Sequence, residues 1–442
     1  MDNVILHILP GRPIRRPNRS LGGRERFDRR MTQDNTAEDV SRKTPHLKAG
    51  SGTPAGRINV LDQLRGVALF AIFLCNLMHL TGASLDEGDQ VGNFLWKTID
   101  VLFGNSSRPL FSFMFGISMM LIFDAAVRKG RRPYPMLLRR MALLLLFGAL
   151  HVFAIWDGDI LFMYALDGFM LMLFLWMPKP LLLIAACVLF LFSSYELQTA
   201  MPPALLNAMQ TISPTTLLYS GVSSLPDQDA LFSNPYFATS FGELVLAIEH
   251  LSFFLFGMYA YRSGLFVRLP RRPKLSASAG AILLLAGWFG KYLYDRGTDD
   301  VWLTTLHPVA CFAVTIGAVL LIVGLAGREG SRSSRLLEPF RSVGRMAFTN
   351  YLMQSLVFVT LFKDSGEGFF ASIGVIGSLP MAAVVPIGIG FFVLQMIVSH
   401  YWLRRFLYGP FEWLWRAGTN LGWPPLRRKN NRASNAGETR SA

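Results

Sequence analysis

A histidine and two aspartates gather around one short turn of the sequence. The stretch 141–168 consists of two apolar runs that meet at Asp157, Gly158 and Asp159, with His151 about two helical turns before them. A turn this short predicts a tight helical hairpin whose tip carries an imidazole and two carboxylates. A neutral imidazole can accept a proton from a hydroxyl or an amine, and an adjacent carboxylate can hold the required tautomer. We therefore predict His151, Asp157 and Asp159 as catalytic residues.

The same three residues also have a structural interpretation, which the sequence leaves open. His151 could bond only to a neighbouring helix and serve packing. Asp157 and Asp159 could be solvated turn residues that cap the next helix, a position where Asp is favoured. For Asp159 the capping role is at least as well supported by the sequence as the catalytic one.

Further along the second apolar run, Tyr164 and Asp167 are three residues apart and share one face of a helix. Asp167 would lie about 12 Å deeper than Asp159, at a rise of 1.5 Å per residue. An ionisable group at that depth needs a partner or a function. Tyr164 alone could supply the partner, and we include both residues among the predicted substrate-binding groups.

A second polar group lies at the inner end of the first apolar segment. Asp62 and Arg65 are three residues apart and predict an ion pair at the membrane boundary. The functional alternative is that Arg65, together with Arg139 and Arg140, binds the phosphates of a cytoplasmic nucleotide-like donor. Both residues of the pair are predicted substrate-binding residues, and the anchoring role of the ion pair remains open beside this one.

In another apolar segment, Asn350 and Gln354 are one helical turn apart. Such amides could line a substrate path, although joining helices in lipid is the more common role. Glu249 and His250 are neighbours that point about 100° apart, so they do not form a natural pair. His79 has the position of an ordinary interfacial residue.

Composition points to a membrane protein. The chain has 442 residues, of which 52% are hydrophobic and only 16% are charged, which is too apolar for a soluble protein with a normal surface. The net charge of +14 resides in the tails and in alternate short loops, so we read it as a topology signal and predict no nucleic-acid partner. Its three cysteines lie in apolar runs, and we predict neither a disulfide framework nor a metal site.

About ten apolar segments approach the length that a helix needs to cross a bilayer. Residues 93–104 form a shorter piece that we interpret as re-entrant or interfacial. Most Lys and Arg fall on one side of the resulting topology, which places both termini in the cytoplasm. The segments lie near 63–82, 107–127, 136–156, 159–177, 181–200, 241–261, 275–294, 302–326, 343–362 and 380–403.

The predicted fold is thus an all-α polytopic helix bundle. Residues 1–57 form a disordered basic cytoplasmic tail, 58–405 the transmembrane domain, and 406–442 an interfacial amphipathic helix followed by a basic cytoplasmic tail. Residues 201–240 form an irregular outer loop. We expect the lipid bilayer as a partner and leave homo-oligomerisation open.

Six linked motifs, at 57–77, 108–117, 150–168, 256–265, 344–356 and 409–416, together resemble the YeiB family of bacterial inner-membrane proteins, built around domain of unknown function 418. The similarity covers the chain from 57 to 416 in order. It implies a multi-pass protein of the bacterial inner (plasma) membrane. Asn76, within the first motif, is a further substrate-binding candidate.

The resemblance also implies two kinds of activity. The family is described as a possible transporter family and is grouped distantly with transmembrane acyltransferases, which move an acyl group from cytoplasmic acyl-CoA to an acceptor at the far face through an intramembrane histidine. On that analogy His151 is the base or acyl carrier, acyl-CoA is the donor, and a small molecule, glycan or lipid is the acceptor.

Two alternatives remain beside the acyltransferase. A secondary transporter would favour inverted repeats and helices broken by Gly or Pro; we find no convincing internal repeat, although Pro386 with Gly388 and Gly390 interrupts the last segment. In a non-enzymatic scaffold, the acidic and histidine residues of the hairpin would be structural.

Overall fold

The computed structural model describes residues 54–83, 85, 87–156, 158–193, 235–296, 301–327, 332–362 and 379–428. Across these ranges the regular structure is helical, with one isolated β-bridge between Phe406 and Arg427. The predicted all-α fold class is therefore confirmed. The predictions for residues 1–53, for Asp157, for the outer loop up to 234 and for the tail beyond 428 lie outside the described residues.

The helices follow the apolar segments of the sequence, and each of the predicted segments overlaps one of them. The α-helices are α2 (Pro54–Thr81), α3 (Gln90–Phe103), α4 (Ser107–Arg128), α5 (Pro133–Ala154), α6 (Leu161–Leu171), α7 (Lys179–Ser193), α12 (Pro235–Arg262), α13 (Leu265–Arg268), α14 (Pro273–Asp295), α15 (Val301–Ala326), α16 (Arg332–Leu336), α17 (Glu338–Arg345), α18 (Ala347–Phe362), α20 (Met381–Arg405) and α21 (Pro410–Asn420). Two short 3-10 helices, η1 (Met172–Phe174) and η2 (Leu269–Arg271), extend α6 and precede α14.

Five helical stretches are long and apolar enough to cross a membrane: Asn59–Thr81, Gln90–Arg128, Pro133–Ala154, Leu306–Ala326 and Met381–Arg405. Pro386 lies inside α20, yet that helix continues from Met381 to Arg405. The predicted interruption of this segment is therefore wrong. With the proline near the start of the helix, few intrahelical hydrogen bonds are lost.

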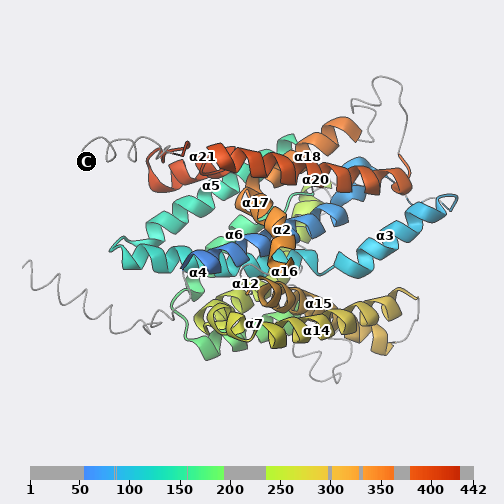
Figure 1. The fold of residues 1–442 in the computed structure, drawn as a ribbon, viewed down its shortest axis with the longest axis horizontal. Helices are drawn as coiled ribbons and strands as arrows, with labels where there is room; N and C mark the ends of the chain where they lie inside the picture. Colours follow the sequence, from blue (N-terminus) through green and yellow to red (C-terminus); the bar gives the residue numbers. More distant parts are fainter. Residues whose placement is uncertain are drawn as a thin grey trace, which may run out of the picture. The chain divides into compact units, whose positions relative to one another are not determined.

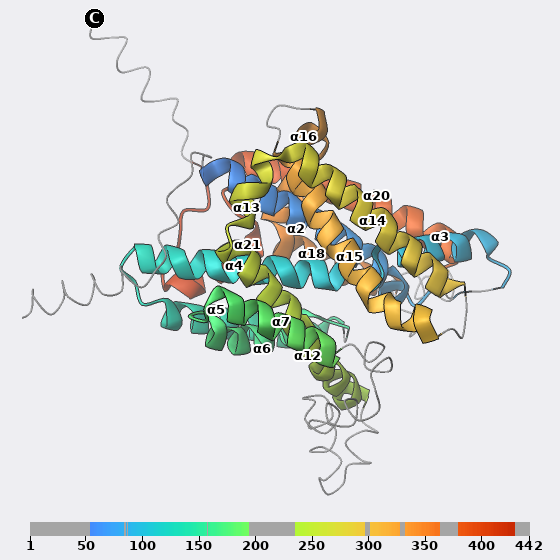
Figure 2. The same ribbon diagram turned by 90° about the horizontal axis from the view of Figure 1, so that it is seen from below.

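α2 is the central helix of the described bundle, and α4, α17, α18 and α20 all pack against it (Figure 1). Its contact with α17 is close because Gly344 faces it. A Cβ atom on Gly344 would lie 1.8 Å from the carbonyl oxygen of Asp62, so only glycine permits this backbone approach. α14 and α15 lie side by side as a long pair, and α7 lies along α12 (Figure 2).

The last helix, α21, begins directly after Gly409, and its aromatic side chains Phe411 and Trp415 contact α18; the interfacial location of this helix stays a prediction. Trp415 contacts Phe348 of α18, with ring centroids 5.4 Å apart. Glu412 accepts bonds from the backbone nitrogen of Thr349 at 2.9 Å and from its hydroxyl at 2.6 Å. Burial raises the pKa of the Glu412 carboxyl above its ordinary value, although the bonds from Thr349 oppose this. Glu412 thereby joins α21 to the first turn of α18.

Candidate functional site at the α5–α6 hairpin

His151 and Asp159 meet at the tip of the α5–α6 hairpin. The Nδ1 atom of His151 lies 3.0 Å from Oδ1 of Asp159, and both side chains are almost completely buried. The carboxylate also accepts a bond at 3.0 Å from the backbone nitrogen of Phe162, in the first turn of α6. Asp159 therefore bonds with the first turn of α6 and also faces the histidine, and its catalytic role stays a prediction.

A glycine lets the two helices approach closely enough for this contact. Gly148 lies on α5 one turn before His151, and a Cβ atom there would be only 2.5 Å from the backbone nitrogen of Phe162. The turn between α5 and α6 then brings Asp159 back beside the end of α5. Asp157, the third predicted catalytic residue, lies outside the described residues.

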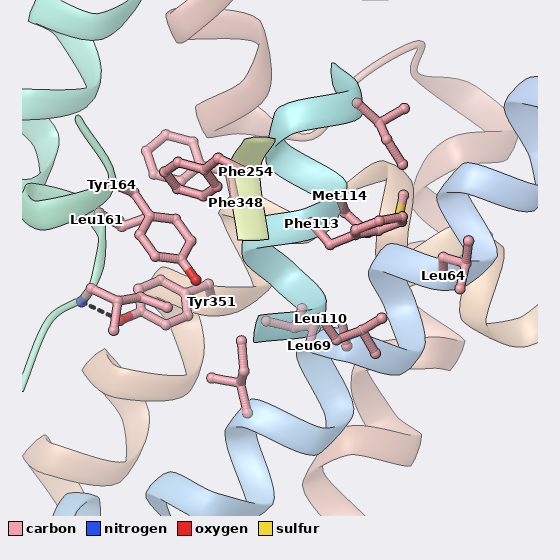
Figure 3. Packing of buried hydrophobic residues seen from close by; sticks show 14 of the residues in the cluster. Leu64, Leu69, Leu110, Phe113, Met114, Leu161, Tyr164, Phe254, Phe348 and Tyr351 are labelled. Carbon is pink, nitrogen blue, oxygen red and sulfur yellow. Dashed lines mark hydrogen bonds between the residues drawn. The ribbon is translucent and has the colours of Figure 1, made fainter. Parts of the chain in front are cut away.

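Tyr351 of α18 completes the group. Its hydroxyl donates to Oδ1 of Asp159 at 2.9 Å and lies 3.4 Å from the backbone nitrogen of Ile160. Its ring centroid lies 5.5 Å from that of His151. Figure 3 shows Tyr351 next to Tyr164, and its dashed line is the bond that the backbone nitrogen of Ile160 donates to the Tyr351 hydroxyl. We did not predict Tyr351, although it directly follows Asn350 in a motif that we had singled out.

The imidazole of His151 retains hydrogen-bonding capacity. The residue is 1% exposed, yet within the described ranges neither of its ring nitrogens has a hydrogen-bond partner of good geometry. The Nδ1 atom is close to Asp159 but is not well aligned with it. The Nε2 atom is therefore a buried polar atom that a ligand could engage, and Asp159 lies beside the other ring nitrogen.

Tyr164 does not serve Asp167 in the way we expected. Its hydroxyl lies 2.8 Å from the hydroxyl of Ser112 and donates to the carbonyl oxygen of Arg108 at 3.1 Å. Asp167 is 1% exposed, and its Oδ2 atom has no hydrogen-bond partner among the residues that the structure describes. His250 is also buried, and its ring lies 5.8 Å from that of Tyr164.

At the other end of the bundle, Asp62 and Arg65 form the predicted ion pair, with Oδ1 and Nη1 2.5 Å apart. Arg65 also donates to the hydroxyl of Ser118 at 3.1 Å. The guanidinium of Arg140 stacks on Trp415, 3.6 Å from the ring centroid. Arg65 is one of the cations close enough to Arg140 to repel it electrostatically, so these two arginines lie at the same end of the molecule.

The predicted amides join helices. The side chain of Asn350 donates to Ser399 at 3.0 Å, and that of Gln354 donates to Gln395 at 2.8 Å. Both partners lie on α20. Asn76 is half-buried on α2. These contacts account for the polarity of Asn350 and Gln354, and a role of any of the three in substrate binding stays a prediction.

Lys291 is a buried charged residue whose role sequence reasoning missed. It is 4% exposed on α14, and its ammonium donates to the carbonyl oxygens of Asp100 and Gly104 at the end of α3. The lysine thus caps the C-terminus of a helix from another part of the chain. Its place within the predicted apolar segment 275–294 was the available signal.

Among the described residues, three or more His, Cys, Asp or Glu side chains nowhere gather in a way that could hold a metal ion. The groups that the structure describes at the hairpin site are an imidazole, a carboxylate and a phenol. Their separation suits transfer of a proton to or from a bound ligand.

These observations define the class of protein: it is all-helical, with several helices suited to crossing a membrane and a buried His–Asp–Tyr group. A model of the family of proteins of unknown function DUF418 matches residues 260–422. The chain is 33% identical over 402 residues to the uncharacterized protein YxaH of Bacillus subtilis, covering 84% of this chain and 96% of that protein. It is 27% identical over 408 residues to the uncharacterized protein YeiB of Escherichia coli, covering 84% and 98%. The chain belongs to the DUF418 family, as its motifs indicated.

Proposed function

We propose that the protein is a membrane-bound acyltransferase that moves an acyl group from a cytoplasmic acyl-CoA to an acceptor at the outer face. The observation that carries the proposal is the buried imidazole of His151, which faces a carboxylate through one nitrogen while Nε2 has no bonding partner within the described chain. This is the arrangement that a general base needs.

In the proposed reaction, Nε2 of His151 takes the proton of an acceptor hydroxyl or amine. The acceptor atom then bonds to the thioester carbonyl carbon, the carbon–sulfur bond breaks, and the proton leaves with the CoA thiolate. Asp159 stabilises the imidazolium that forms. Tyr351 holds Asp159 in place through its 2.9 Å bond.

Arg65 and Arg140, at the opposite end of α5 from His151, would bind the phosphates of the donor. Arg140 and His151 lie on the same helix, about 16 Å apart along its axis. An extended acyl-CoA, with its phosphates at the arginines and its thioester toward His151, would connect the two groups.

The topology that we propose has ten spans, with both termini in the cytoplasm of a bacterial inner membrane. Support comes from the overlap of each predicted segment with a helix and from the unequal distribution of Lys and Arg. Fusion of alkaline phosphatase after successive helices tests it: activity should alternate from one fusion to the next, and a fusion at the C-terminus should be inactive.

The first experiment for the acyltransferase is calorimetric titration of the purified protein with acetyl-CoA, followed by a CoA-release assay with membrane lipid and glycan extracts as acceptors. We expect Arg65→Ala to lose acetyl-CoA binding. His151→Gln should keep binding but lower CoA release by about 10²–10⁴-fold. His79→Gln is the matched control, because His79 is exposed. Absence of acyl-CoA binding by folded protein would refute the proposal.

One observation favours a second candidate, a proton-coupled transporter. Asp167 is a buried carboxyl whose Oδ2 atom lacks a partner within the described ranges, and such groups mark proton pathways in membrane proteins. Asp167→Asn distinguishes the two functions. An acyltransferase with the His151 site intact should keep its activity in this variant, whereas a proton-coupled transporter reconstituted in vesicles should lose pH-driven uptake.

A further inference from the structure

A recess lined by arginines lies where the start of α5 meets the end of α21. Its lining consists of Arg131, Arg132, Pro135, Met136, Arg139 and Asn420, and its volume is about 300 Å³. It is separate from the hairpin site, because it lies at the opposite end of α5 from His151. Neither the His–Asp–Tyr group nor Arg65 contributes to it.

The local sequence explains why the guanidinium groups converge. Gly130 has a φ of 64°, a conformation that glycine adopts without strain, and it turns the chain from α4 into α5. Arg132 directly precedes α5, and Arg139 lies on that helix seven residues further along the chain. The Nε atom of Arg139 donates to the carbonyl oxygen of Thr419 at 3.1 Å, which fixes this side chain against α21.

Among the described residues, no carboxylate neutralises the positive charge of the recess. No acidic side chain lines it. The arginine ion pairs of the described residues are Arg65 with Asp62 and Arg341 with Glu338, and neither involves the recess. Guanidinium groups bind phosphate oxygens in paired hydrogen bonds, so a phosphate fits this lining.

Apolar residues beside the recess favour a lipid as the source of that phosphate. Leu421 and Trp423 follow Asn420 directly and are 75% and 70% exposed. The recess also lies at the start of the candidate membrane span Pro133–Ala154. Exposed Trp and Leu next to arginines at the end of a span are typical of the headgroup region of a bilayer.

We propose that this recess binds the phosphate of an anionic phospholipid headgroup, with Leu421 and Trp423 against the upper part of its acyl chains. The test below changes Arg131 and Arg132, which have no part in the donor or hairpin sites, and leaves Arg139, a predicted donor contact, unchanged. Basic pockets between helices at a membrane surface bind anionic headgroups in this way.

The test measures lipid retention on delipidated, detergent-purified protein by native mass spectrometry, with phosphatidylglycerol and phosphatidylcholine added in parallel. The variant is Arg131→Gln/Arg132→Gln. Its matched control is Arg271→Gln/Arg272→Gln, which removes the same charge from another exposed loop. We expect the first variant to weaken phosphatidylglycerol binding about 30-fold, at roughly fivefold for each arginine, and the control to leave it unchanged.

A second arm separates a lipid from a soluble phosphate ligand. Leu421→Asn/Trp423→Gln should weaken phosphatidylglycerol binding, while inorganic phosphate should not compete with the lipid. The proposal would be overturned if both arginine variants lost the same affinity for phosphatidylglycerol, or if the two lipids bound equally well. It would also be overturned if inorganic phosphate displaced the lipid while the Leu421→Asn/Trp423→Gln change had no effect on lipid binding. Thermal unfolding of every variant confirms that it is folded.

Discussion

Asp159→Asn exchanges one carboxylate oxygen for an NH₂ group while keeping the shape of the side chain. The backbone N–H of Phe162 can only donate, so the amide oxygen must take the place of Oδ2, which accepts that bond at 3.0 Å. The NH₂ group then faces the Tyr351 hydroxyl and Nδ1 of His151, at the place where Oδ1 now lies. His151 must in turn expose a lone pair on Nδ1, which moves its proton to Nε2.

The magnitude follows from the bonds that change. A hydrogen bond to a charged group contributes about 1.5–3 kcal/mol and one to a neutral group about 0.5–1.5 kcal/mol. The bond from Phe162 weakens, and the bond that Tyr351 donates is replaced by one that the amide donates to the Tyr351 oxygen, so we expect the free energy of unfolding to fall by about 1–2 kcal/mol. Base catalysis by His151 should fall by about 10²–10⁴-fold, because the proton now occupies the nitrogen that must accept one.

Nitrogen-15 NMR of histidine-labelled protein in detergent reports the tautomer without requiring a known substrate. The sequence has 7 histidines, so the signals can be assigned by single substitutions, with His79→Gln as a reference that does not involve the hairpin. We expect the wild type to carry the proton on Nδ1 and Asp159→Asn to carry it on Nε2. The same tautomer in both proteins would refute the claim that Asp159 orients the ring.

Three further perturbations test the helix contact at Gly148 and the buried charged groups Lys291 and Glu412. Gly148→Ala should destabilise the protein by about 1–3 kcal/mol in thermal unfolding, because its Cβ would meet the backbone of α6 at 2.5 Å. Gly390→Ala, where no atom lies within 4 Å, should instead stabilise it by up to about 1 kcal/mol; equal effects would contradict this. Lys291→Met should cost about 1–3 kcal/mol, since it removes the side-chain donor from the carbonyl oxygen of the buried Gly104 and leaves the carbonyl oxygen of Asp100 with only the backbone N–H of Gly104. The exposed Lys274→Met should be nearly neutral, and a neutral Lys291→Met would disprove the capping role. Because burial raises the pKa of Glu412, its protonation favours the folded state. The unfolding temperature of the wild type relative to Glu412→Gln should therefore rise as pH falls from neutral toward about 4.3, the pKa of a glutamate in the unfolded chain. A decrease in that difference would show that the pKa of Glu412 is lowered rather than raised in the folded protein.

The hairpin site could be predicted in large part because it is local. Two apolar runs separated by a short polar turn must fold back on each other, and this places His151 near Asp159 whatever the rest of the bundle does. The sequence could not show that the two side chains touch, since that depends on the rotation of α5 relative to α6. Gly148 sets that rotation by allowing one particular backbone contact.

Tyr351 and Lys291 could not be predicted in the same way, because each bonds with a segment far away in the chain. Tyr351 reaches back to the hairpin from α18, and Lys291 reaches back from α14 to the end of α3. Neither contact follows from periodicity or spacing, which report only on neighbours within one element. The partnership expected between Tyr164 and Asp167 failed for the same reason, since a residue on α4 bonds with Tyr164.

The two ends of α5 explain how one helix can connect separate chemical groups. Arg140 is held near its start by stacking on Trp415 of α21, and His151 is held near its end by the approach of α6 at Gly148. A helix is stiff along its axis, so these two contacts fix the distance between the cationic end and the imidazole at about 16 Å. Because α6 runs back along α5, the same packing also determines how deep Asp167 lies. The positions of the imidazole, the arginine and the Asp167 carboxyl are therefore set together by a single helical hairpin, whichever of the two proposed functions the protein performs.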